Sequence, residues 1–211
     1  MIPTKEIKKL RAFNKNPKLK KDMVAEVLNH QKLDKIIKGT YQQGSNGDFK
    51  GCAVGCSIHS YNVRYKKEIP TNNHKAYETE LGIPESLARL EDTLFEGMPD
   101  GKALLWPAEF MKAIKVGSDL SLVAPKFISA TLRDLLSIRE VKDDKEVSKQ
   151  VLHIAKMWDS VVNGKTPKAS AWSAAESAAW SAARSAARSA ARSAAYYKMS
   201  RRLLKILKAT K

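Results

Sequence analysis

Cysteine is scarce in this sequence: Cys52 and Cys56 are the only two among 211 residues. Two closely spaced cysteines do not form the framework of bridges that stabilises small secreted domains. Long apolar runs are also missing, since no window approaches the ~18 residues of a membrane-spanning helix, and no N-terminal stretch has the layout of a signal peptide. We therefore expect a soluble cytoplasmic protein that does not associate with membranes.

Acidic residues are few relative to basic ones. The chain has 38 Lys and Arg against 22 Asp and Glu, a formal net charge of +16. The charge is uneven: residues 1–38 carry +7, residues 76–100 carry −6 and residues 164–211 carry +10. Such a field favours polyanionic partners, namely nucleic acid, an anionic nucleotide or an acidic host protein.

Helical periodicity dominates the apolar pattern, and proline and glycine separate the segments. The predicted class is all-α, with at most a minor β-hairpin near residues 40–50. The predicted helices cover residues 17–38, 52–59, 74–81, 84–96, 107–114, 125–137 and 143–162. We expect a compact helical domain over 1–163, a linker over 164–168 and a separate basic Ala/Ser-rich helix over 169–211.

The last segment is built from a repeat of four residues containing Ser-Ala-Ala, and alanine makes it a strong helix former. One position of the repeat is occupied in turn by Trp172, Glu176, Trp180, Arg184, Arg188, Arg192 and Tyr196. We expect the two tryptophans to pack on the domain and the arginines to extend away from it.

Two interpretations of this basic helix stay open. Its cations are Arg184, Arg188, Arg192, Lys198, Arg201, Arg202 and Lys205, which would contact phosphates without reading sequence. The alternative is a low-complexity helix with a solvated charged row. Its Ala and Ser side chains would also suit contacts between copies of the chain, giving a homo-oligomer.

The two cysteines lie within the stretch FKGCAVGCSIHSYN, together with His59. If Cys52 begins a helix, the helix N-terminus would lower the pKa of its thiol, as a nucleophilic cysteine requires. His74 is then the candidate general base, because His59 lies too far along the same helix. Glu78, one turn beyond His74, is the candidate residue that orients the imidazole.

The same residues suit two other interpretations. Cys52, Cys56, His59 and His74 supply four nitrogen and sulfur ligands, the number that tetrahedral zinc requires. Alternatively, the cysteines are small apolar residues of a packed helix, because free cysteine is among the most buried residue types. Neither a nucleophilic cysteine nor a buried structural cysteine requires a cofactor.

Three segments carry a resemblance to a known group of proteins. GCAVGCSIH at 51–59, HKAYETELGIPESLARLEDTLFEG at 74–97, and the Ser-Ala-Ala array followed by YYKMSRRLLKIL resemble small proteins of bacteriophages and prophages. The resemblance implies a phage origin and action in the cytoplasm of a bacterial host, where such a protein would counter host defence.

Three functions follow as hypotheses. The first is a phage-type accessory protein that binds a polyanion or a host factor. The second is a thiol hydrolase or transferase that uses Cys52. The third is a structural protein that assembles through the repeat helix.

Overall fold

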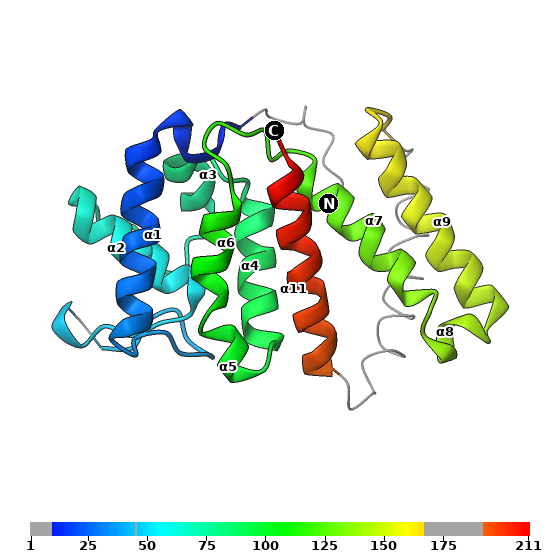
Figure 1. Ribbon diagram of the computed structural model, residues 1–211, viewed down its shortest axis with the longest axis horizontal. Helices are drawn as coiled ribbons and strands as arrows, with labels where there is room; N and C mark the ends of the chain where they lie inside the picture. Colours follow the sequence, from blue (N-terminus) through cyan, green and yellow to red (C-terminus); the bar gives the residue numbers. More distant parts are fainter. Residues whose placement is uncertain (1–9, 45, 167–191) are drawn as a thin grey trace. The chain divides into compact units, whose positions relative to one another are not determined.

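The computed structural model describes residues 10–44, 46–166 and 192–211 of the chain. Its α-helices are α1 (Pro17–Lys32), α2 (Ala53–Tyr65), α3 (Lys75–Leu81), α4 (Glu85–Gly97), α5 (Asp100–Ala103), α6 (Trp106–Ala113), α7 (Val123–Leu135), α8 (Arg139–Lys142), α9 (Lys145–Val162) and α11 (Arg192–Ala209) (Figure 1). No β-strand occurs in these ranges. The predicted hairpin is reduced to one antiparallel bridge between Gln43 and Lys50, and the predicted all-α class is confirmed. None of the helices described is long and apolar enough to cross a lipid bilayer.

The chain forms two compact units. Of the described residues, the larger unit contains 10–121 and 193–211, and the smaller unit contains 122–166 and Arg192. The larger unit is therefore discontinuous in sequence, with the smaller unit inserted into it.

In the larger unit, α1 shows why the helices begin where proline and small polar residues stand. The side chain of Asn16 accepts hydrogen bonds from the N–H groups of Lys18 and Leu19, and Pro17 occupies the first turn. Its buried positions include Leu19, Met23 and Val27, and the helix packs against α2 and α6.

The end of α1 differs from the prediction, which extended the helix to residue 38. The helix ends at Lys32, and Asp34 then adopts a left-handed backbone conformation with φ of 54°. Ile36 is buried from an extended segment that bridges to Gly51. Ile36 thus continues the apolar period of α1 in the sequence, but it lies in a loop and not on a face of the helix.

Glycines allow a loop to lie against the start of α2. A Cβ atom on Gly51 or Gly55 would overlap the backbone carbonyl of Tyr41. The loop around Tyr41 consequently packs on the first turn of α2, and this close approach places Tyr41 beside the site described below. Helix α2 then continues to Tyr65, beyond the two turns that were predicted.

Helix α4 is central to the larger unit and packs against α2, α3 and α6. It follows the left-handed turn at Gly82, where φ is 63°. Its buried side includes Leu87, Leu94 and Phe95. The indole N–H of Trp106 donates to the backbone carbonyl of Glu91 at 3.0 Å, which ties α6 to the middle of α4.

The C-terminal helix α11 belongs to this larger unit and packs against it. Leu203, Leu204 and Leu207 are at most 3% exposed. Arg201 donates two hydrogen bonds of 2.8 Å to the carboxylate of Glu109 on α6. The predicted packing of Trp172 and Trp180 lies outside the described residues.

The smaller unit contains α7, α8 and α9, and α7 packs along α9. Its core is formed by Val141 and Val151 together with the partly buried residues Leu132, Leu135, Leu136, Ile138 and Val147. Asp144 caps α9 by accepting from the N–H groups of Glu146 and Val147.

Candidate functional site

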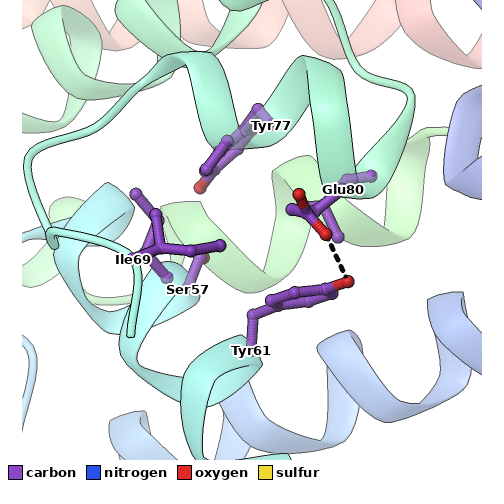
Figure 2. A pocket seen from close by; sticks show the side chains of 8 residues that line it. Ser57, Tyr61, Ile69, Tyr77 and Glu80 are labelled. Carbon is purple, nitrogen blue, oxygen red and sulfur yellow. Dashed lines mark hydrogen bonds between the residues drawn. The ribbon is translucent and has the colours of Figure 1, made fainter. Parts of the chain in front are cut away.

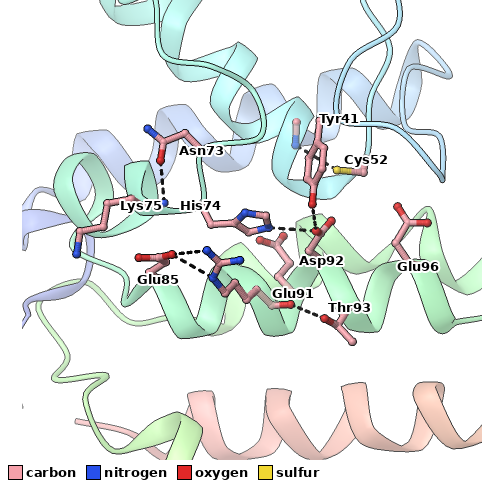
Figure 3. A network of polar contacts seen from close by, with 12 residues as sticks. Tyr41, Cys52, Asn73, His74, Lys75, Glu85, Glu91, Asp92, Thr93 and Glu96 are labelled. Carbon is pink, nitrogen blue, oxygen red and sulfur yellow. Dashed lines mark hydrogen bonds and ion pairs between the residues drawn. The ribbon is translucent and has the colours of Figure 1, made fainter. Parts of the chain in front are cut away.

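The side chain of Asp92 on α4 is the centre of a polar cluster in the larger unit (Figure 3). Its Oδ2 accepts a hydrogen bond of 2.8 Å from the hydroxyl of Tyr41. Nε2 of His74 lies 3.1 Å from the same oxygen. Because an ionised carboxylate only accepts hydrogen bonds, Nε2 carries the proton and donates it.

Local backbone structure brings these side chains together. Cys52 is the N-cap of α2, and its sulfur accepts from the N–H of Gly55 at 3.4 Å. His74 immediately precedes α3. The Tyr41 ring meets the His74 ring edge to face, with centroids 5.6 Å apart. The loop at Tyr41, the start of α2 at Cys52 and the start of α3 at His74 therefore converge on the carboxylate of Asp92.

Three side chains could together hold a metal ion, namely those of Cys52, Asp92 and Glu96. One possible ligand atom from each lies within 4.8 Å of the other two. In the described part of the chain this is the one such group. Asp92 and Glu96 share a face of α4 because they are four residues apart. The backbone N–H of Gly39 donates to both oxygens of Glu96, at 3.1 and 3.0 Å. Cys52 is buried and Glu96 is exposed, so the group opens to solvent on one side.

The surroundings of Cys52 favour the thiol over the thiolate. Burial raises the pKa of Cys52, and the charge of Asp92 raises it further, against a smaller opposing effect of the Gly55 N–H. Burial and the hydrogen bond to Asp92 also raise the pKa of Tyr41 to about 12. Cys52 does begin a helix, but the predicted lowering of its pKa is wrong because desolvation outweighs the helix terminus.

Glu91, the neighbour of Asp92, is fully buried. Neither of its carboxylate oxygens has a hydrogen-bond partner, and Oδ1 of Asp92 also lacks one. Burial raises the pKa of Glu91 to about 8; the nearby Tyr77 hydroxyl opposes this shift and the charge of Asp92 adds to it. Glu91 therefore holds its proton at neutral pH and adds no charge to the cluster.

The structure brings Cys52 and His74 to the same carboxylate, but the other predicted residues lie elsewhere. The carboxylate of Glu78 accepts from Lys75 at 2.6 Å and from the N–H of Glu85 at 3.5 Å. Asp92 occupies the orienting position beside His74 that was predicted for Glu78.

The predicted zinc ligands are divided between two places. Cys56 donates to the backbone carbonyl of Gly51 at 3.3 Å, and burial raises the pKa of its thiol to about 12. The imidazole of His59 stacks on Phe49, with ring centroids 3.8 Å apart and an interplanar angle of 6°. Cys56 and His59 therefore do not join Cys52 and His74 in one ligand set.

Sequence reasoning did not identify Tyr41, Asp92 and Glu96 as site residues. One signal was present: Glu91 stands on the same helical stripe as Leu87 and Leu94, where a charged residue is unexpected. A carboxylate on an apolar stripe indicates a buried polar site, and the neighbouring Asp92 belongs to it. Nothing in the spacing predicted that the Tyr41 loop would reach this helix.

The outward face of α11 is a second candidate site, and it contains several predicted cations. Lys198, Arg201, Lys205 and Lys208 are exposed, and Arg202 is partly exposed. Arg192 begins α11, whereas the predicted positions of Arg184 and Arg188 lie outside the described residues. The exposed positions follow helical spacing opposite the buried leucines, so the cations form a row along one side. We call these five residues the basic face.

A small cleft lies between α2 and α3 (Figure 2). It measures about 200 Å³ including its opening, and Ser57, Ile69 and Tyr77 are among its lining residues. The hydroxyls of Ser57 and Tyr77 are buried there, and at the rim Tyr61 donates to Glu80 at 2.7 Å. Small-molecule sites usually measure ~300–1,000 Å³, and buried hydroxyls are commonly satisfied by water. We therefore assign this cleft to hydration.

Comparisons with models of protein families, with curated proteins and with solved structures find no match to this chain.

Proposed function

We propose that this protein binds a polyanion, nucleic acid above all, through the basic face of α11. The observation that supports this most is the row of exposed cations on a helix whose opposite side is anchored by Leu203, Leu204 and Leu207. No acidic residue occurs in α11. A fixed cationic row of this kind suits a phosphate backbone, which requires charge but no reading of bases.

The dimensions of the row agree with this proposal. Lys198 and Lys208 are ten residues apart, which corresponds to about 15 Å along a helix axis. Duplex DNA carries one charge per ~1.7 Å of its axis, so several phosphates lie within that distance. Arg201 is partly neutralised by Glu109, which leaves the lysines as the stronger contributors.

The resemblance to bacteriophage proteins adds a context to the proposal. A phage protein with a cationic row would act on nucleic acid, or on an acidic host factor, in the bacterial cytoplasm, where countering host defence is the expected role. The thiol hydrolase is the weaker alternative, because a buried Cys52 with a raised pKa is a poor nucleophile. Assembly through the repeat remains the competing role for the same helix.

The test is fluorescence anisotropy with labelled duplex and single-stranded DNA over a series of salt concentrations. Two triple variants are compared with the parent: Lys198, Lys205 and Lys208 to Gln, and Arg184, Arg188 and Arg192 to Gln. A matched control replaces the exposed Lys142, Lys145 and Lys149 of the smaller unit by Gln. Because each phosphate contact releases about one counterion, the lysine variant should flatten the slope of log K against log salt by about 2–3 units.

Three results would contradict the proposal. They are absence of DNA binding by the parent at low salt, an unchanged slope in both α11 variants, and an equal effect of the control variant. Concentration-dependent mass in light scattering, lost in the arginine variant without any DNA binding, would support assembly instead.

A further inference from the structure

We propose that Cys52, Asp92 and Glu96 form a binding site for a divalent transition-metal ion of borderline softness, such as zinc. The site lies between the N-terminus of α2 and the middle of α4. It differs from the ligand set predicted from sequence, because Asp92 and Glu96 replace Cys56, His59 and His74. It is independent of the basic face and of nucleic-acid binding.

The distances fit such an ion. The three donor atoms lie within 4.8 Å of one another. Zinc bonds of ~2.0–2.3 Å in tetrahedral geometry place ligand atoms about 3.5 Å apart, so small side-chain rotations complete the site. Glu96 is exposed, which gives the ion a path from solvent and leaves a coordination position for water.

Asp92 is prepared to act as a ligand. Tyr41 and His74 both hold Oδ2 of Asp92, at 2.8 and 3.1 Å. Oδ1 is buried and has no partner in the protein. Outer hydrogen bonds that orient a ligating carboxylate are a regular feature of metal sites. Oδ1 is therefore the oxygen that faces the ion, and Tyr41 and His74 are positioning residues.

A second observation is an acidic group buried next to Asp92. Glu91 is fully buried and both of its oxygens lack partners. Glu91 directly precedes Asp92 on α4 (Figure 3). A buried polar group without a hydrogen-bond partner is costly, and an occupied site beside it would lower that cost.

Besides His74, two basic side chains near this cluster are paired with other carboxylates. Lys38, whose charge reaches Glu96, donates to Asp100 at 2.8 Å. Arg89, whose charge reaches Tyr41, donates to Glu85 at 2.6 Å. A divalent ion bound at the cluster would offset the charge of its two carboxylates, Asp92 and Glu96.

The donor set selects the kind of ion. A sulfur ligand disfavours magnesium and calcium, which prefer oxygen donors throughout. Sulfur with carboxylate oxygens suits zinc, and cobalt(II) is its spectroscopic substitute. On binding, the Cys52 thiol gives its proton to solvent and its sulfur forms the bond to the metal, so one proton is released per ion bound.

The experiment uses the full-length protein after removal of metal with a chelator. Zn²⁺ alone is titrated by calorimetry, and Co²⁺ is added in parallel to observe the thiolate-to-cobalt charge-transfer band. We expect one ion per chain. Asp92→Asn and Glu96→Gln should each weaken Zn²⁺ binding by about 10- to 100-fold or more, and Cys52→Ser should abolish the cobalt band. Cys56→Ala and Glu85→Gln are matched controls that should retain both.

Unchanged affinity in Asp92→Asn and Glu96→Gln would overturn the proposal, as would absence of stoichiometric binding by the parent. Loss of the cobalt band in Cys56→Ala but not in Cys52→Ser would overturn it too. Circular dichroism establishes that each variant is folded. Glu96 is exposed, so Glu96→Gln should fold and still tests the proposal if the buried Cys52→Ser variant does not fold.

Discussion

The ring of Tyr196 lies directly on Gly97, where α11 meets the end of α4. A Cβ atom at position 97 would overlap ring atoms of Tyr196. The absence of a side chain at this position is what allows the helix to pack so closely.

Gly97→Ala should therefore disturb the docking of α11. Overpacking at a close contact typically costs about 1–3 kcal/mol of unfolding free energy, and urea denaturation would measure it. Gly101→Ala is the matched control, because a Cβ there meets no atom within 4 Å. Equal stability of the two variants would show that Tyr196 does not hold α11 on Gly97 in solution.

Acidification should destabilise the larger unit through His30. Its ring is 5% exposed, and burial, helped by the charges of His59 and Lys35, lowers its pKa from 6.5 to about 4. The unfolded chain binds a proton below about pH 6.5 and the folded one does not until about pH 4. Stability contributed by neutral His30 is thus present at neutral pH and is lost as pH falls through this window.

The expected loss is about 2–3 kcal/mol between neutral pH and about pH 4.5, measured from urea midpoints at each pH. His30→Gln, which keeps an acceptor for the hydroxyl of Ser60, should reduce the dependence on pH. His153→Asn at an exposed position should leave it unchanged. A pH profile that His30→Gln does not alter would exclude His30 as its source.

Both thiols should resist alkylation in the folded protein. Cys52 is 1% exposed and Cys56 is 0% exposed, and burial raises the pKa of each. Iodoacetamide at neutral pH should label neither residue within the time that labels both in urea, as mass spectrometry would show. Rapid and selective labelling of Cys52 would contradict this and restore the thiol hydrolase as the favoured function.

Substitution of Val151 should destabilise the smaller unit without destabilising the larger one. Val151 is 1% exposed in its core, and Val151→Ala should cost about 1–3 kcal/mol through the lost contacts and the cavity. Hydrogen exchange should then accelerate in residues 123–162 and stay unchanged in 17–113. Lys149→Ala, on the exposed side of α9, should change stability by less than about 0.5 kcal/mol. Faster exchange over both ranges would mean that the two units unfold together.

Most helices were predictable because proline, glycine and capping residues mark them locally. Asn16 and Pro17 begin α1, and the turn at Gly82 separates α3 from α4. The ends were harder, because the apolar period continues through Ile36 although Asp34 has already left the helix. The short helices α5 and α8 contain too few residues to show a period.

The candidate site was only half predictable. Cys52 and His74 were identified because their side chains carry distinctive chemistry. Asp92 was missed because its role arises from tertiary packing: the Tyr41 loop reaches it only where Gly51 and Gly55 allow close approach. This close approach requires that Gly51 and Gly55 have no side chain, and the apolar period of the sequence does not predict it.

The discontinuity of the larger unit has a consequence for biosynthesis. Residues 10–121 leave the ribosome first, but Leu203, Leu204 and Leu207, which complete their core, emerge only after the whole smaller unit. At translation rates of ~5–20 residues per second, the nascent larger unit waits about 4–17 s without its last helix. During that interval the apolar surface that later receives α11 is open to other chains. This protein should therefore depend more on chaperones while it is being translated than while it refolds from urea.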